Sequence, residues 1–271
     1  MRERHSRGAW KAMGNNILRA VQAAILAVMA MASWATPGRA EPTGTTLVVA
    51  VHARPADRAA LRVIMEKEQA ARLKQWQSDG LLAGYRLLFT RYADTGVWDA
   101  MEILSFRDSA ALSRWRAVEQ QAPGGLNARA MALVTTVETV PTSDVRNEGN
   151  IAASDPAVLV IPYRSLVSAP DYLHYLDGYT IPQFKGWIGE GVLADYHIMT
   201  STYPAGRDWN ALIVLRYKDD ASLARREEIV TKVRARLALD PAWKAISDDK
   251  KAIRTEGIVA IADQISGSAG Q

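Results

Sequence analysis

Two stretches of the chain repeat one another, 111 positions apart, and decide the fold: Lys74–Leu112, KQWQSDGLLAGYRLLFTRYADTGVWDAMEILSFRDSAAL, and Lys185–Leu223, KGWIGEGVLADYHIMTSTYPAGRDWNALIVLRYKDDASL. Aligned without a gap, they are identical at 13 of 39 positions. Internal similarity of this length indicates a duplicated structural unit and has to be recognised before any other feature is interpreted.

Each repeat has the pattern of a β-α-β-β-α-β unit. In the first repeat, helical periodicity covers residues 56–76, and Asp108 or Ser109 is the expected cap of a second helix. Apolar and β-branched runs predict the four strands, at Thr46–Ala53, Leu81–Tyr92, Trp98–Phe106 and Met131–Val140.

The second repeat follows the same order of elements. Its expected elements are the strand Ala157–Tyr163, the helix Asp171–Tyr179, the hairpin Val192–Tyr217, the helix Ala221–Leu239 and a strand near Gly257–Ala262. Pro182 is expected to interrupt the first helical region, because an interior proline removes a backbone hydrogen bond. The segment Asp240–Arg254 is longer than its counterpart in the first repeat.

The stretch between the repeats, Pro141–Pro156, is polar and predicts a linker. The expected organisation is an export signal at 1–40, a first unit at 41–145, a linker at 146–156, a second unit at 157–265 and a tail at 266–271.

A β-α-β-β-α-β unit is a ferredoxin-like arrangement with both helices on one face of its sheet. The other face is uncovered, and a second copy offers the simplest way to bury it. We therefore predict an α+β fold in which two tandem ferredoxin-like units pack sheet to sheet as a fused pseudo-dimeric α/β barrel.

Three segments resemble the dimeric α/β-barrel superfamily: the Gly80–Tyr85 strand entry, the Trp98–Ile103 strand and the Phe106–Leu112 helix start. This superfamily includes antibiotic-biosynthesis monooxygenase-like, EthD-like and stress-responsive A/B-barrel domains. The resemblance implies a ligand held between sheet and helices. Haem-degrading members use a histidine in the helix after the third strand, where this chain has Arg114 and Trp115, so their mechanism is not expected here.

The first 40 residues have the features of an export signal: a basic start, an uncharged run from Ala20 to Ala35, and small residues before Ala40. Cleavage is expected after Ala40, with Ala35 as the alternative. The protein is then periplasmic or secreted. Since the run is short for a membrane span, an uncleaved N-terminal anchor is the second interpretation.

Residues 41–271 carry 27 basic and 28 acidic side chains, so the basic excess of the whole chain belongs to the expected signal. This balance excludes the basic surface that nucleic acid requires, and we predict no stable membrane insertion after cleavage. The chain has no cysteine, which rules out disulfides and thiolate chemistry.

Charged residues within apolar strands are the candidate catalytic groups. Even spacing places Arg86 and Glu102 on one face of the first hairpin, either as a structural ion pair or as a polar cluster facing a cavity. Asp195 and His197 share a face in the second hairpin, either as an acid/base pair or as a polar surface patch.

The recurring aromatic residues are candidate ligand contacts or core side chains, namely Tyr85, Trp98, Tyr196 and Trp209. His52 aligns with Tyr163 at the end of the first strand of each repeat, and both are further candidates. For His52 the alternative is a hydrogen-bonded, partly buried imidazole.

The predicted function is the binding of a small apolar or aromatic molecule. A cofactor-independent oxygenase, isomerase or lyase is one alternative, and a structural or interaction module with a filled interior is another. We predict no cofactor and no metal, since no phosphate loop, metal-spaced cluster or nucleophile elbow occurs. The two units can cover each other's open sheet faces, so a monomer is expected. Further dimerisation through strand edges is the alternative.

Overall fold

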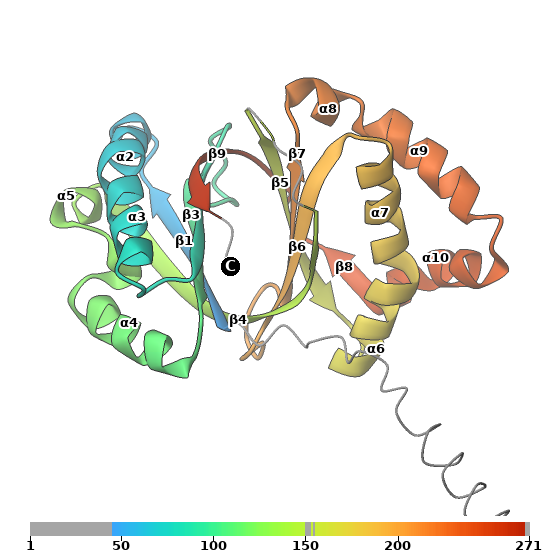
Figure 1. The fold of residues 1–271 in the computed structure, drawn as a ribbon, viewed down its shortest axis with the longest axis horizontal. Helices are drawn as coiled ribbons and strands as arrows, with labels where there is room; N and C mark the ends of the chain where they lie inside the picture. Colours follow the sequence, from blue (N-terminus) through green and yellow to red (C-terminus); the bar gives the residue numbers. More distant parts are fainter. Residues whose placement is uncertain (1–44, 150–152, 154, 269–271) are drawn as a thin grey trace, which may run out of the picture. The chain divides into compact units, whose positions relative to one another are not determined.

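The computed structural model describes residues 45–149, 153 and 155–268. The expected export signal at 1–40 lies outside the described residues. Contacts group the described residues into one compact unit. The β-α-β-β-α-β order is confirmed for both repeats, and Figure 1 shows their helices outside the strands.

In the first repeat the strands are β1 (Thr45–Ala53), β2 (Gly84–Thr90), β3 (Ala100–Phe106) and β4 (Val134–Glu148). The helices are α2 (Arg58–Ile64), α3 (Ala70–Ser78), α4 (Ser109–Gln121) and α5 (Ala128–Met131), with a π-helical segment at Met65–Gln69 and a 3-10 turn at Pro123–Gly125. Asp108 caps α4 by accepting the Ala111 N–H, as its sequence position predicts.

In the second repeat the strands are β5 (Ala157–Ser165), β6 (Leu193–Ser201), β7 (Ala211–Tyr217), β8 (Arg254–Glu256) and β9 (Ala260–Ser268). The helices are α6 (Ala169–Tyr175), α7 (Ile181–Gly189), α8 (Asp220–Ala224), α9 (Arg226–Leu237) and α10 (Pro241–Ile253), with a π-helical segment at Leu176–Thr180. The predicted Ala221–Leu239 helix divides at Arg225, and the longer segment after it contains α10, which supplies Trp243 to the core.

Eight of the strands close into one antiparallel barrel. The first repeat contributes β4-β1-β3-β2, and the second continues with β9-β5-β7-β6. The pairs β2–β9 and β4–β6 join the repeats and complete the ring. The short β8 adds to β5 beside the ring. The predicted fold class, two ferredoxin-like units forming one α/β barrel, is confirmed.

The polar stretch after Val140 is strand and not linker as far as Glu148. Residues Val134–Ser143 of β4 pair with β1, and Thr142–Glu148 pair with β6 of the other repeat. The expected tail likewise begins inside β9, which pairs with β5 and then with β2. Polarity misled the prediction because this half of β4 has exposed side chains and also carries an interior charge, Asp144.

Pro182 does not interrupt the helix. Helical turns run from Ala169 to Gly189, and the π-helical segment Leu176–Thr180 ends just before the proline. A π turn changes the hydrogen-bond spacing and can absorb the missing N–H. The first repeat has a π-helical segment at the same position, Met65–Gln69, without a proline. The π turn therefore belongs to the duplicated scaffold and is not caused by Pro182.

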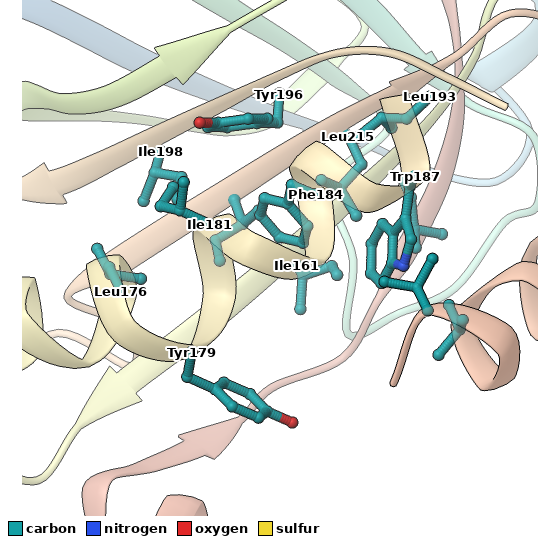
Figure 2. Close-up of a cluster of buried hydrophobic side chains, with 14 of the residues drawn as sticks. Ile161, Leu176, Tyr179, Ile181, Phe184, Trp187, Leu193, Tyr196, Ile198 and Leu215 are labelled. Carbon is teal, nitrogen blue, oxygen red and sulfur yellow. The ribbon is translucent and has the colours of Figure 1, made fainter. Parts of the chain in front are cut away.

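The core has three parts. Each repeat has one cluster between its sheet and its helices. The third cluster fills the middle of the barrel with residues such as Val48, Leu88 and Val214. Figure 2 shows the cluster of the second repeat, in which Phe184 of α7 packs against Tyr196 of β6. Because both faces of the sheet are covered, the strands read as nearly continuous apolar runs.

A candidate binding pocket at the barrel mouth

A pocket of about 370 Å³ opens inside the barrel, at the end where β1 and β5 finish and β3 and β7 begin. Its lower wall is apolar and includes Val48, Met101 and Leu212. Trp98 and Trp209, both partly buried, line it from the two hairpin connections. Trp98 and Trp209, which occupy the same position in the two repeats, therefore meet at one cavity.

Both repeats build this pocket from equivalent positions. Trp98/Trp209 and Met101/Leu212 lie 111 positions apart. On β1 and β5 the offset is 112, because Val51 faces Ala100 in β3 as Tyr163 faces Ala211 in β7. The alignment of His52 with Tyr163 is therefore wrong by one residue.

Three polar side chains at the mouth break this symmetry. The imidazole of His52 has no hydrogen-bond partner among the described residues, whereas its backbone carbonyl accepts the Thr135 hydroxyl at 3.1 Å. Glu138 accepts from Arg207 at 2.8 Å. Asp208 stands opposite Val97 in the alignment, and its carboxylate has no partner within the described part of the chain.

A second pocket of about 460 Å³ adjoins the first, and His52 and Val97 line both. Asp99 lies at its base, where it accepts the Ala53 N–H at 2.7 Å and Arg58 Nε at 2.8 Å. The second pocket is lined by a larger share of charged and hydroxyl side chains than the first, and its lining belongs entirely to the first repeat.

Away from this mouth, the barrel interior contains an ion network between the repeats. Asp195 of β6 accepts from Arg86 of β2 at 3.0 Å and from Arg216 Nε of β7 at 2.5 Å. The Asp195 side chain is only 5% exposed, so its charge depends on both guanidinium groups.

His197 belongs to the same interior layer and bonds to Asp144 of β4, Nε2 to Oδ1, at 2.6 Å. The Thr46 hydroxyl of β1 donates to the same carboxylate at 2.6 Å. Burial raises the pKa of Asp144, but the hydrogen bond and charge of His197 and the Thr46 bond outweigh it, so the pKa lies below its ordinary value.

Arg86 and Glu102 lie on opposite faces of the sheet, so the expected pair does not form. In the hairpin, Arg86 faces Ile103 and Leu87 faces Glu102. Even positions of β2 therefore share a face with odd positions of β3. The prediction that even positions of both strands share one face is therefore wrong by one residue, and this offset exchanges inside and outside.

Glu102 faces the helices, where it is completely buried. Its carboxyl accepts the Gln69 side-chain amide at 2.8 Å, from the π-helical segment of the first repeat. Burial raises the pKa of Glu102 to about 8, against the lowering effect of the Gln69 bond and of Arg72. Glu102 is therefore a neutral acid at pH 7.

Asp195 and His197 share the interior face, as their even spacing predicts, but they do not pair with one another. Asp195 binds the two arginines and His197 binds Asp144.

The recurring tyrosines lie on the helix side. Tyr85 bonds to Ser266 at 3.0 Å, Tyr196 to Glu148 at 3.2 Å, and Tyr163 to Glu256 at 3.1 Å. Of the predicted ligand contacts, His52, Trp98 and Trp209 reach the barrel pocket.

Sequence reasoning missed Asp144 because it lies in the supposed linker. Arg216 carried a usable signal, since it is a lone charge between apolar residues of β7, in the same situation as Arg86. No sequence signal marked Glu138, because its position at the pocket depends on the pairing of β4 with β1.

A groove on the helix side of the second repeat marks another difference between the halves. In the first repeat Trp115 packs edge-on against Trp76, with 5.0 Å between the ring centroids, and closes this space. Arg226 takes the equivalent position in the second repeat, at 5.8 Å from the Trp187 ring, and a groove of about 360 Å³ lies beside it.

Within the described residues, no group of three or more His, Cys, Asp or Glu side chains is arranged to hold a metal ion. The helices of that same part include none with the length and apolar character of a membrane span.

No protein-family model matches this chain, and no curated protein matches it in sequence. Solved structures share its fold. A proposed monooxygenase from Lactobacillus acidophilus NCFM aligns with a TM-score of 0.54 and 11% identity, over 84% of this chain and 97% of its own. A proposed monooxygenase from Fusobacterium nucleatum aligns with a TM-score of 0.54 and 13% identity, over 83% and 94%.

An anthrone oxidase-like protein aligns with a TM-score of 0.51 and 10% identity, over 85% of this chain and 94% of its own. At such low identity the likeness shows the fold alone, and it confirms the barrel that the three sequence segments suggested.

Replacing Asp195 by Asn should destabilise the protein strongly, because two guanidinium groups would lose their shared carboxylate in the barrel interior. The expected loss is about 3–5 kcal/mol in the free energy of unfolding, measured by urea titration. The control is Asp248→Asn, which removes an exposed i,i+4 pair with Lys244 and should change little. Equal effects for the two variants would contradict a network that holds the repeats together.

Replacing Glu102 by Gln should stabilise the protein at alkaline pH. The folded-state pKa of Glu102, about 8, lies above the ordinary value of 4.5. The contribution of Glu102 to the free energy of unfolding is therefore fully present below pH 4.5 and is lost as the pH rises to 8, because the unfolded chain ionises first. Glutamine cannot ionise and should gain a few kcal/mol over wild type near pH 8.5 and almost nothing near pH 4.5. Unfolding at both pH values measures this. A gain independent of pH would show that Glu102 is not the titrating group.

Proposed function

We propose that this protein binds a small apolar or aromatic molecule inside the mouth of its barrel. The observation that carries the proposal is the 370 Å³ pocket between Trp98 and Trp209, with an apolar wall below. Its volume falls within the range of about 300–1,000 Å³ that is usual for small-molecule sites. The large, flat indole rings of the two tryptophans provide contact area for an aromatic ligand.

The barrel interior supports this location better than the space between sheet and helices. Packed side chains fill that space in the first repeat, where Trp115 is buried against Phe106 at 5.9 Å. The groove beside Arg226 in the second repeat lacks paired aromatic walls. The pocket also favours binding over a purely structural module, which was expected to have a filled interior.

A cofactor-independent oxygenase that uses the same pocket is the second candidate. The observation in its favour is the unpaired imidazole of His52, which is available as an acid or base at the pocket wall. Arg86, Asp195 and His197 are engaged in the ion network, and Glu102 faces the helices. Oxygen uptake with a bound hydroxylated aromatic, in wild type and in His52→Phe, tests this candidate.

We also infer that the chain is exported, with a mature form that begins at Glu41, and that it is a fused pseudo-dimer of the dimeric α/β-barrel superfamily which acts as a monomer. The signal pattern at 1–40 and the duplicated sequence support these inferences. The intact mass of the protein recovered from an export-competent host, and its mass in solution, test them.

Filling the pocket should abolish binding. Ala50→Phe places a ring inside the cavity, whereas Trp98→Ala and Trp209→Ala should each weaken binding about tenfold by removing a wall. The measurement is the fluorescence of the neutral probe N-phenyl-1-naphthylamine. Tyr203→Ala is the control, because Tyr203 is 68% exposed in the second hairpin connection and does not line the pocket. Undiminished binding to Ala50→Phe would exclude this pocket as the site.

A further inference from the structure

We propose that the two adjoining pockets form one bipartite site for an aromatic molecule that carries a hydroxyl-bearing group and no negative charge, with His52 bonding the ligand where the two parts join. This inference rests on the proposed function, because it assigns the aromatic part to the barrel pocket. It adds the class of the polar part and the residue that recognises it.

The position of His52 is the first step. His52 and Val97 line both pockets, so they form the boundary between the tryptophan-walled cavity and the cavity lined by Asp94, Asp99 and Thr136. The ring nitrogens of His52 have no partner among the described residues, although the residue is only partly exposed. A half-buried imidazole can donate through one nitrogen and accept through the other, which suits a hydroxyl group.

The polar groups that remain free in the second pocket also suit hydroxyls. Arg58 is engaged by Asp99 and Thr90, and the Thr135 hydroxyl is donated to a backbone carbonyl. The Thr136 hydroxyl has no partner within the described residues. Asp94 uses one carboxylate oxygen for the Gly96 N–H, at 2.9 Å, and its second oxygen can accept another donor.

The charges around the two pockets disfavour an anionic ligand. Four carboxylates line them, and two are balanced, Asp99 by Arg58 and Glu138 by Arg207. Asp94 and Asp208 are left without a cation in the described part of the chain. The local field is therefore negative, which raises the free energy of a bound carboxylate or phosphate.

The second repeat does not reproduce the polar pocket, so the combined site has a single orientation. Asn210 replaces Asp99 and accepts the Ser165 N–H at 2.7 Å, the bond that Asp99 makes to Ala53. Ala205 takes the position of Asp94, and Arg164 that of His52. The backbone bond was kept after duplication while the ligand-facing groups diverged.

Calorimetry with three matched probes tests this inference: 2-naphthol, 2-naphthyl β-D-glucoside and 2-naphthyl phosphate. The glucoside should bind about tenfold more tightly than naphthol, since two or three additional hydrogen bonds each add about 0.5–1.5 kcal/mol before ordering costs. The phosphate should bind more weakly than naphthol. His52→Phe and Thr136→Val should each reduce the advantage of the glucoside at least threefold and change naphthol binding less than twofold.

The control is His174→Phe on α6, an exposed histidine that lines neither pocket and should change no affinity. Circular dichroism confirms folding of each variant. If naphthol binds and the glucoside binds no better, or if His52→Phe keeps the full advantage, the bipartite site is wrong and the proposed function stands. If neither naphthol nor the glucoside binds, the proposed function itself is wrong.

Discussion

The structure depends on the pairing of each repeat's last strand with both repeats. β4 begins against β1 of its own unit and continues against β6 of the other, and β9 does the same with β5 and β2. Without these two crossings, each four-stranded sheet would have an apolar inner face and two open edges. With them, the backbone of both units forms one closed hydrogen-bonded ring, which removes the edges that other chains could pair with.

Closure also determines where polar groups can lie. The outer face packs under helices and the middle of the interior is apolar, so a buried charge in the interior needs a partner from another strand. Arg86 and Arg216 meet Asp195, and Asp144 meets His197. All of these bonds except that between β6 and β7 cross from one repeat to the other, so the ion network and strand crossings stabilise the same junction. The mouth, which has fewer such bonds, keeps an open pocket.

The duplicated scaffold could be predicted from sequence because element order follows from local patterns. The Asp108 cap, the order of the apolar runs and the 111-residue offset of the central stretch agree with the structure. The faces of the strands could not be predicted in the same way. Whether Glu102 points inward or outward depends on the register of β2 against β3, which a nine-residue connection sets. That connection has no short-turn signature, and an error of one position reverses every assignment.

Part of the candidate pocket could be expected from the sequence. Trp98, Trp209 and His52 were identified because aromatic residues and histidine are conspicuous in strand ends, and they do meet at the pocket. Asp144 was missed because it lies where β4 crosses to the other repeat, and Glu138 because its place at the pocket depends on the pairing of β4 with β1. A polar segment with few apolar residues is typical of a linker, and nothing local distinguishes it from a strand that carries interior charges.

Fusion of the two units explains why the interior diverged while the frame did not. A symmetric dimer has to form every contact twice, so an interior charge needs a complementary group that each identical copy can supply. In this chain Arg86 pairs with Asp195, while their counterparts His197 and Gly84 form no such pair. One ion network therefore replaces two. By the same reasoning, Val97 and Asp99 of the first repeat correspond to Asp208 and Asn210 of the second. The pocket therefore has paired tryptophan walls but polar side chains that differ between its two sides. A fused chain can orient an asymmetric ligand where a symmetric dimer would present two equivalent poses.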